Sequence, residues 1–129
     1  MPFLRHASLV LVTLIATTAC APDDLVPTEP MALDGTSLVI EALPQERCDP
    51  ADFYAVRVRW KVTDWGQPRF DLHLDSSKGK LWARENRTEG EKDSEAFVRP
   101  GMFFVLVDRN SRMVVAATPA PPLVCPPAD

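Results

Sequence analysis

The chain has 129 residues, a formal net charge of −4 and 46% hydrophobic residues, which is enough apolar material for the core of one globular domain. The mild acidity argues against a nucleic-acid partner, which would require a basic surface, so we expect none. Most of the 13 prolines fall in two stretches, 22–30 and 119–127, and these stretches are therefore expected to lie outside the regular core.

Residues 1–19 have the pattern of a secretory signal peptide. Arg5 and His6 supply a short basic region, and 7–19 are uncharged and mostly apolar. This apolar stretch of 13 residues is too short to cross a bilayer, since a spanning helix takes roughly 20. We therefore leave these residues out of the fold and expect an exported protein.

The end of this segment, Ile15-Ala-Thr-Thr-Ala-Cys20, resembles the lipobox of bacterial lipoprotein precursors, in which the cysteine is acylated and becomes the new N-terminus. Ala19 and Thr18 fit the two positions before the cysteine, whereas Thr17 stands where an aliphatic residue is usual. The resemblance implies a lipid on Cys20 and attachment to a membrane. The alternative is ordinary signal cleavage close to the cysteine, which would leave Cys20 unlipidated.

Cysteine parity bears on the same question, because the chain has three cysteines, Cys20, Cys48 and Cys125. Thiols pair in the oxidising compartment that an exported chain enters, so an odd cysteine needs an explanation. If Cys20 carries lipid, Cys48 and Cys125 form a disulfide; if it does not, Cys20 is a free or intermolecular thiol. Ala21 rather than Asp follows Cys20, which by resemblance to lipoproteins of enteric bacteria favours the outer membrane.

Residues 21–35 contain three prolines and four acidic residues and show no hydrophobic periodicity. They are predicted to form an extended tether, with a reach of roughly 46 Å, that holds the domain off the membrane. The alternative is an irregular edge segment packed on the fold. We accordingly place the lipidated cysteine and tether at 20–36, and the folded domain with its Pro-rich tail at 37–129.

A first short strand is expected at 37–43, and 53–62 shows the clearest alternation of the chain. Because side chains of a strand alternate between its two faces, every second residue of 53–62 is expected in the core. The predicted core residues are Tyr54, Val56, Val58, Trp60 and Val62, and the predicted solvent-facing ones are Arg57, Arg59 and Lys61.

Alternation returns at 69–75, where Phe70, Leu72 and Leu74 are expected inward and Asp71, His73 and Asp75 outward. A shorter strand is predicted at 79–85, with Leu81 and Ala83 on one side and Trp82 on the other. The polar stretch 86–94 is interpreted as a loop, and 95–99 as a strand that leads into a turn at Pro100-Gly101.

The most apolar strand is expected at 102–107, MFFVLV, and its composition predicts burial on both faces. Gly101 before it tolerates a positive φ, which a turn needs. A hairpin loop at 108–112 then leads to a last strand at 112–118. About seven short strands without a helical pattern indicate an all-β fold, namely an antiparallel immunoglobulin-like β-sandwich.

The pattern over 37–118 resembles fibronectin type III and related immunoglobulin-like domains. The resemblance rests on Trp60, on Phe70-x-Leu-x-Leu74 and on Val98-x-Pro-Gly-x-Phe103. It implies that strands 53–62 and 69–75 lie in different sheets and are joined by an arch. The alternative is a direct hairpin, with Lys61 opposite Asp71 and Arg57 opposite Asp75. These domains often carry a tyrosine after the Pro-Gly, where this chain has Phe103 and Phe104, so no tyrosine-corner hydrogen bond is expected there.

Little in the sequence suggests chemistry. His73 between Asp71 and Asp75 is the only histidine after the signal peptide, too few ligands for a zinc site. We therefore expect no enzyme activity, cofactor or metal. The candidate binding surface consists of two tryptophans and a basic row: Trp65, Trp82, Arg57, Arg59 and Lys61.

The sequence thus predicts a lipid-anchored, non-catalytic binding or structural module on the periplasmic face of the bacterial outer membrane. An envelope protein or a glycan is the expected kind of partner. The alternatives are a periplasmic inhibitor or immunity-type lipoprotein, and a carbohydrate-binding module that uses Trp65 and Trp82.

Overall fold

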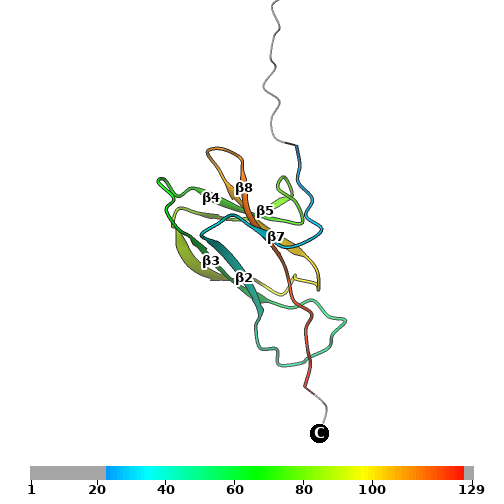
Figure 1. Cartoon of the computed structure of the whole chain (residues 1–129). Coiled ribbons are helices and arrows are strands. Elements are labelled where there is room, and N and C mark those ends of the chain that lie inside the picture. The colour runs from blue at the N-terminus through cyan, green and yellow to red at the C-terminus, as the bar shows by residue number, and fades with distance from the viewer. Residues whose placement is uncertain (1–22, 127–129) are drawn as a thin grey trace, which may run out of the picture.

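Residues 23–126 are described by the computed structural model, and this part of the chain contains strands and no helix. Eight strands form two antiparallel sheets that pack face to face as a β-sandwich (Figure 1). The expected all-β fold class is confirmed, and the arrangement is compatible with an immunoglobulin-like domain. The predicted signal peptide (1–19) and the predicted lipidation site, Cys20, lie outside the described residues.

The smaller sheet has the order β2–β3–β6 and the larger the order β1–β8–β7–β4–β5. The bounds are Met31–Ala32 for β1, Thr36–Ala42 for β2, Val56–Val62 for β3, Phe70–Leu74 for β4, Lys80–Glu85 for β5, Glu89–Asp93 for β6, Phe103–Asp108 for β7 and Val114–Pro119 for β8. Because β3 and β4 belong to different sheets, the predicted arch is confirmed and the hairpin alternative is wrong.

The core lies between the sheets and follows the predicted alternation of β3. The five side chains expected inward are at most 2% exposed: Tyr54, Val56, Val58, Trp60 and Val62. Phe70, Leu72 and Leu74 of β4 face them from the other sheet and are also buried. The indole Nε1 of Trp60 donates a hydrogen bond to the carbonyl oxygen of Arg87 at 3.0 Å, so the largest core side chain leaves no polar atom unpaired.

β7 is buried on both faces, as its composition predicts. Phe104 and Leu106 belong to the main core, whereas Val105 and Val107 form a second apolar cluster with Ala117 of β8 on the outer face of the sheet. Gly101, just before the strand, has the expected positive φ of 80°. The hairpin loop at 108–112 is confirmed, with Arg112 in the left-handed region at a φ of 64°.

Two of the predicted elements between β5 and β7 are wrong. The stretch 86–94, expected to be a loop, contains β6, and 95–99, expected to be a strand, contributes only an isolated bridge between Val98 and Tyr54. Sequence patterns miss β6 because its core-facing side carries no apolar side chain. Gly90 stands there instead, paired with Trp60, whose indole fills the space. The sandwich therefore has eight strands rather than about seven.

β5 is an edge strand whose side chains are shifted by a β-bulge. Leu72 pairs with Ala83 and His73 pairs with Leu81, so Trp82 is the extra residue of the bulge. Trp82 and Ala83 both pack against the core, while Leu81 lies on the outer face with 38% of its surface exposed. The prediction that Leu81 and Ala83 share a face is wrong, because a bulge changes the side-chain alternation by one residue.

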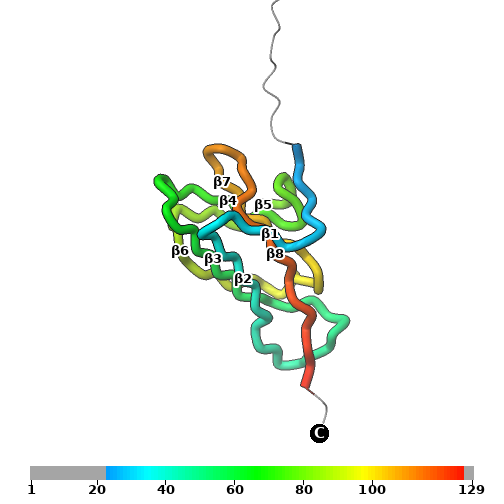
Figure 2. Tube along the Cα trace, viewed as in Figure 1, coloured from blue at the N-terminus to red at the C-terminus, as the bar shows by residue number. Residues whose placement is uncertain are grey.

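From residue 24 onward, the predicted tether is packed on the fold, as the edge-segment alternative describes. Ser77 and Leu25 exchange hydrogen bonds, from Leu25 N to Ser77 Oγ at 2.8 Å and from Ser77 N to Leu25 O at 2.9 Å. β1 then pairs with β8, and Leu33 N donates to Val115 O at 2.9 Å. Figure 2 shows this segment, in blue, running down one side of the domain and across to β2.

The C-terminal tail is fixed to the opposite end of the domain (Figure 1). The predicted disulfide between Cys48 and Cys125 is present, with a Cα–Cα distance of 5.4 Å. Tyr54, two residues before β3, is buried and donates a hydrogen bond from its hydroxyl to the carbonyl oxygen of Pro121. A tyrosine hydroxyl therefore does hold the backbone, at a place other than the one after Pro100-Gly101.

Candidate functional site

The two tryptophans of the candidate surface lie in separate places. Trp65 packs on Phe70 with ring centroids 5.8 Å apart, and Trp82 packs edge-on against Phe104 at 5.4 Å. Phe70 pairs with Asp108 at one end of the β4–β7 ladder, and Phe104 pairs with Leu74 at the other end. Both indoles are half-buried covers of the core rather than one exposed aromatic platform.

The basic row on β3 faces solvent as predicted, but acidic side chains flank it. Arg57 forms a two-pronged contact with Asp93 of β6, at 2.8 and 3.1 Å. Arg59 contacts Glu91 of β6 and Glu41 of β2, both at 3.1 Å. Lys61 is paired in register with Glu89. The row is thus neutralised within its own sheet and does not form an isolated cationic surface.

The contact between Arg57 and Asp93 also shifts the pKa values of both side chains. The hydrogen bonds from the Arg57 guanidinium lower the pKa of the Asp93 carboxyl, and Asp93 in turn raises the pKa of Arg57. The acidic partners alternate along 89–93 as the basic residues do along 57–61. This matching alternation of opposite charges is the one signal for β6 in the sequence, although the polar composition of 86–94 predicts a loop.

The outward residues of β4 are divided between two environments. His73 Nδ1 lies 2.9 Å from the carbonyl oxygen of Gly79, and its Nε2 lies 3.9 Å from Asp71 Oδ2. Asp75 lies in the turn after β4, is exposed, and contacts Arg99 at 3.6 Å. Across residues 23–126, no group of three or more His, Cys, Asp or Glu side chains could hold a metal ion.

Asp71 is the centre of a basic cluster on the outer face of the larger sheet. Its side chain is only 13% exposed, and its Oδ1 accepts a hydrogen bond from Arg109 Nε at 3.0 Å. Arg84 Nε lies 3.6 Å from the same oxygen. Arg109 also donates to the carbonyl oxygen of Phe70 at 3.3 Å. One carboxylate is therefore shared by two guanidinium groups.

This cluster forms the floor of a cleft with a volume of about 800 Å³. The charged residues that line it are four basic and two acidic, an excess of two positive charges: Lys78, Arg84, Arg109, Arg112, Asp23 and Asp71. No pattern in the sequence indicates this site, because its residues come from five separate segments of the chain. Among them, Asp23 lies on the docked N-terminal segment, and Leu81 reaches the cleft through the bulge in β5.

The cleft has the chemistry of an anion-binding surface and lacks an assembled nucleophile. Ser77 is the hydroxyl that lines it, but its Oγ accepts from Leu25 N at 2.8 Å and donates to Asp24 Oδ1 at 3.2 Å. It therefore fixes the N-terminal segment instead of contacting His73. Guanidinium groups with one shared carboxylate can pair with an added phosphate or carboxylate.

No protein-family model matches the chain, and neither the curated proteins nor the solved structures contain a match to it. Within 23–126, the structure holds no helix of the length and apolarity that crossing a membrane takes. The disulfide, the cleft and the docked N-terminal segment are thus the structural features that bear on function.

Proposed function

We propose that the chain is an exported, lipid-anchored β-sandwich that serves as a non-catalytic binding or structural module of the bacterial envelope. The observation that carries the proposal is the disulfide between Cys48 and Cys125. It uses two of the three cysteines and leaves Cys20, which follows the lipobox-like Ile15-Ala-Thr-Thr-Ala, as the odd one. A cysteine in that position is the acceptor of the lipid in bacterial lipoproteins.

Within the β-sandwich class, we place the domain with fibronectin type III and immunoglobulin-like modules. The placement is supported by the grouping of β2, β3 and β6 in one sheet and of β4, β5, β7 and β8 in the other. Folds of this kind support many unrelated functions, so the fold supports a module and not a particular activity. The periplasmic face of the outer membrane is the proposed location.

The test of the anchor is metabolic labelling with a clickable palmitate analogue. The wild-type chain and the Cys48→Ala/Cys125→Ala variant, which keeps Cys20, should both be labelled, and Cys20→Ala should not. Fractionation of the labelled envelope then locates the protein between inner and outer membrane. An unlabelled wild-type chain would mean a soluble exported domain, and label on Cys20→Ala would place the lipid elsewhere.

A further inference from the structure

We propose that the basic cleft on the outer face of the larger sheet rests on the phosphate headgroups of the membrane that holds the lipid on Cys20. The inference builds on the proposed lipid anchor and specifies what the domain does beside it. In this arrangement the domain lies against the bilayer surface and is not held away from it. The cleft, through Arg84, Arg109, Arg112 and Lys78, is the contact surface.

The chain between the anchor at Cys20 and the fold is short. Asp24 Oδ1 accepts hydrogen bonds from Lys78 N at 2.8 Å and from the Ser77 hydroxyl at 3.2 Å, and Leu25 bonds Ser77 in both directions. The docked part therefore begins at Asp24. Between Cys20 and Asp23 there are only three Cα–Cα steps, a reach of at most about 11 Å.

That short connection meets the domain at the cleft. Asp23 is itself one of the residues that line the cleft. The surface nearest the anchor is therefore the basic one. The headgroup layer of one leaflet is about 5–8 Å thick, so a reach of about 11 Å brings the rim of the cleft to the phosphates.

The basic side chains of the cleft are free to bind a further anion. Within 23–126, Lys78 and Arg112 form no salt bridge, and Arg84 keeps 64% of its side chain exposed beside Asp71. These groups remain available for a phosphate, which guanidinium groups bind through paired hydrogen bonds. The chain as a whole carries −4, so the sign at the cleft is opposite to that of the protein.

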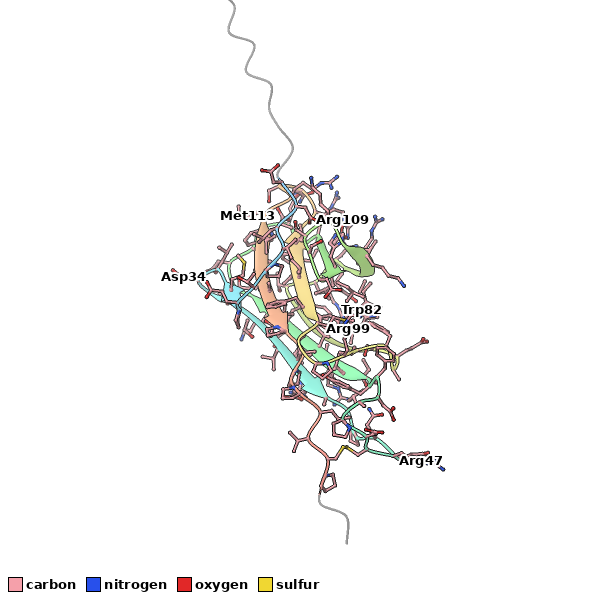
Figure 3. All side chains as sticks on the ribbon, turned by 90° about the vertical axis from the view of Figure 1, so that its right-hand side faces the viewer. Asp34, Arg47, Trp82, Arg99, Arg109 and Met113 are labelled. Carbon is pink, nitrogen blue, oxygen red and sulfur yellow. A yellow bond between two sulfur atoms is a disulfide. The ribbon has the colours of Figure 1, made fainter. Side chains whose placement is uncertain are left out.

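The rest of the charge distribution orients the domain in the same sense. On the outer face of the smaller sheet, on the other side of the sandwich, the carboxylates of Glu41, Glu91 and Asp93 are all paired with arginines of β3. An anionic bilayer therefore attracts the cleft, with its excess of two positive charges, more strongly than this charge-balanced face. In Figure 3, Arg109 and Met113 lie at the end of the domain where the described chain begins, and Arg47 lies at the far end.

A free phosphate in solution offers the same chemistry as a phospholipid headgroup. The headgroup is favoured because the cleft lies beside Asp23, close to the anchor. The anchor keeps the cleft near headgroup phosphates at a high local concentration. The experiment separates the two sources by offering each of them to the same protein.

The test uses residues 21–129, which retain every described residue and the disulfide but lack Cys20. Flotation with vesicles of phosphatidylglycerol and phosphatidylcholine, at low ionic strength, is compared with pure phosphatidylcholine vesicles. The Lys78→Gln/Arg112→Gln variant should lose about 25-fold in partitioning, about fivefold for each charge near an anionic surface. The matched control, Lys61→Gln/Arg47→Gln, also removes one exposed lysine and one exposed arginine, but away from the cleft, and should change partitioning less than about threefold.

Three results would overturn the proposal. The first is wild-type protein that shows no preference for the anionic vesicles, and the second is an equal loss of binding in the cleft and control variants. Binding of glycerol phosphate in solution without vesicle binding would assign the cleft to a soluble phosphate. Because residues 21–129 lack Cys20, the vesicle result is independent of the palmitate label. If the full chain is labelled but 21–129 shows no vesicle preference, only the proposal for the cleft is refuted. If 21–129 prefers anionic vesicles but the full chain takes no label, the role of the cleft beside a lipid anchor is refuted.

Discussion

Trp60 of β3 lies directly opposite Gly90 of β6, and the indole occupies the space that a β-carbon on Gly90 would need. A β-carbon built there would stand 2.5 Å from Cζ2 of the indole, well inside contact distance. The ring nitrogen is fixed by its hydrogen bond to Arg87 O, so the indole cannot swing away without losing that bond. This contact explains how a strand without apolar side chains can cover a hydrophobic core.

Gly90→Ala is therefore expected to destabilise the domain by about 1–3 kcal/mol, the range for overpacking a core. Urea unfolding followed by tryptophan fluorescence measures the change. Gly66→Ala is the matched control, because a β-carbon at Gly66 meets nothing within 4 Å, and its midpoint should be unchanged or slightly raised. Equal midpoints for Gly90→Ala and the wild type would show that the indole does not hold this position.

Strands could be predicted from the sequence wherever apolar residues alternate or form a continuous run. β3, β4 and β7 are of this kind, and their patterns were enough to predict the two-sheet architecture and the arch between β3 and β4. The sequence pattern did not predict strands whose position depends on contacts with a neighbouring strand. β6 is held by Trp60 beneath it and by ion pairs to the arginines of β3, and the bulge in β5 has no local signature.

The candidate site was less predictable than the fold for the same reason. Trp65, Trp82 and the basic row are predicted as exposed binding groups. In the structure the two indoles pack on Phe70 and Phe104, and the arginines of the row form ion pairs within their sheet. The cleft collects residues from segments up to 89 positions apart, from Asp23 to Arg112. Only the packing of the N-terminal segment on Ser77 brings Asp23 to it.

Loss of the disulfide should be the largest single-site effect on stability. The bond joins positions 77 apart in the sequence, and in the chain-entropy model closing a loop of that length contributes about 4 kcal/mol. Reducing agent, or the Cys48→Ala/Cys125→Ala variant, should lower the urea midpoint accordingly. A chain with Cys20→Ala keeps the bond and should unfold like the wild type. If reduction leaves the midpoint unchanged, the tail adds nothing to the fold.

Tyr54 should give the fold a dependence on alkaline pH. Burial raises the pKa of its hydroxyl above the ordinary value of 10.0. The unfolded chain then ionises at lower pH than the folded one, so the contribution of Tyr54 is fully present below pH 10.0 and is lost as pH rises through the folded pKa. Tyr54 is the only tyrosine, so ultraviolet titration of the phenol reports it alone.

The Tyr54→Phe variant separates this hydrogen bond from other alkaline effects. It should lose about 1 kcal/mol at neutral pH, because the Pro121 carbonyl oxygen loses its donor. Its stability should then fall less steeply than that of the wild type when the pH is raised above 10.0. Parallel pH profiles for the two proteins would contradict the assignment of the alkaline loss to Tyr54.

Asp24 should make the docking of the N-terminal segment sensitive to acid. The hydrogen bond from Lys78 N lowers the pKa of the Asp24 carboxyl from its ordinary value of 3.8. The contribution of a carboxyl with a depressed pKa is present above that ordinary value and is lost as pH falls through the folded pKa. Protection of the Ser77 and Lys78 amides from hydrogen exchange should therefore decrease in acid, while the amides of β7 stay protected.

Asp24→Ala should expose the Lys78 amide at neutral pH, because its acceptor is gone, and should remove the acid dependence. It should also weaken protection of the Ser77 amide, which donates to Leu25 O of the same segment. Asp34→Ala is the control, since Asp34 is an exposed carboxylate that accepts no hydrogen bond within 23–126. Release of the segment lengthens the connection from Cys20, so Asp24→Ala in the lipidated protein should also let the cleft move away from the headgroups. Unchanged protection of Ser77 and Lys78 in Asp24→Ala would mean that Leu25 and β1 hold the segment without Asp24.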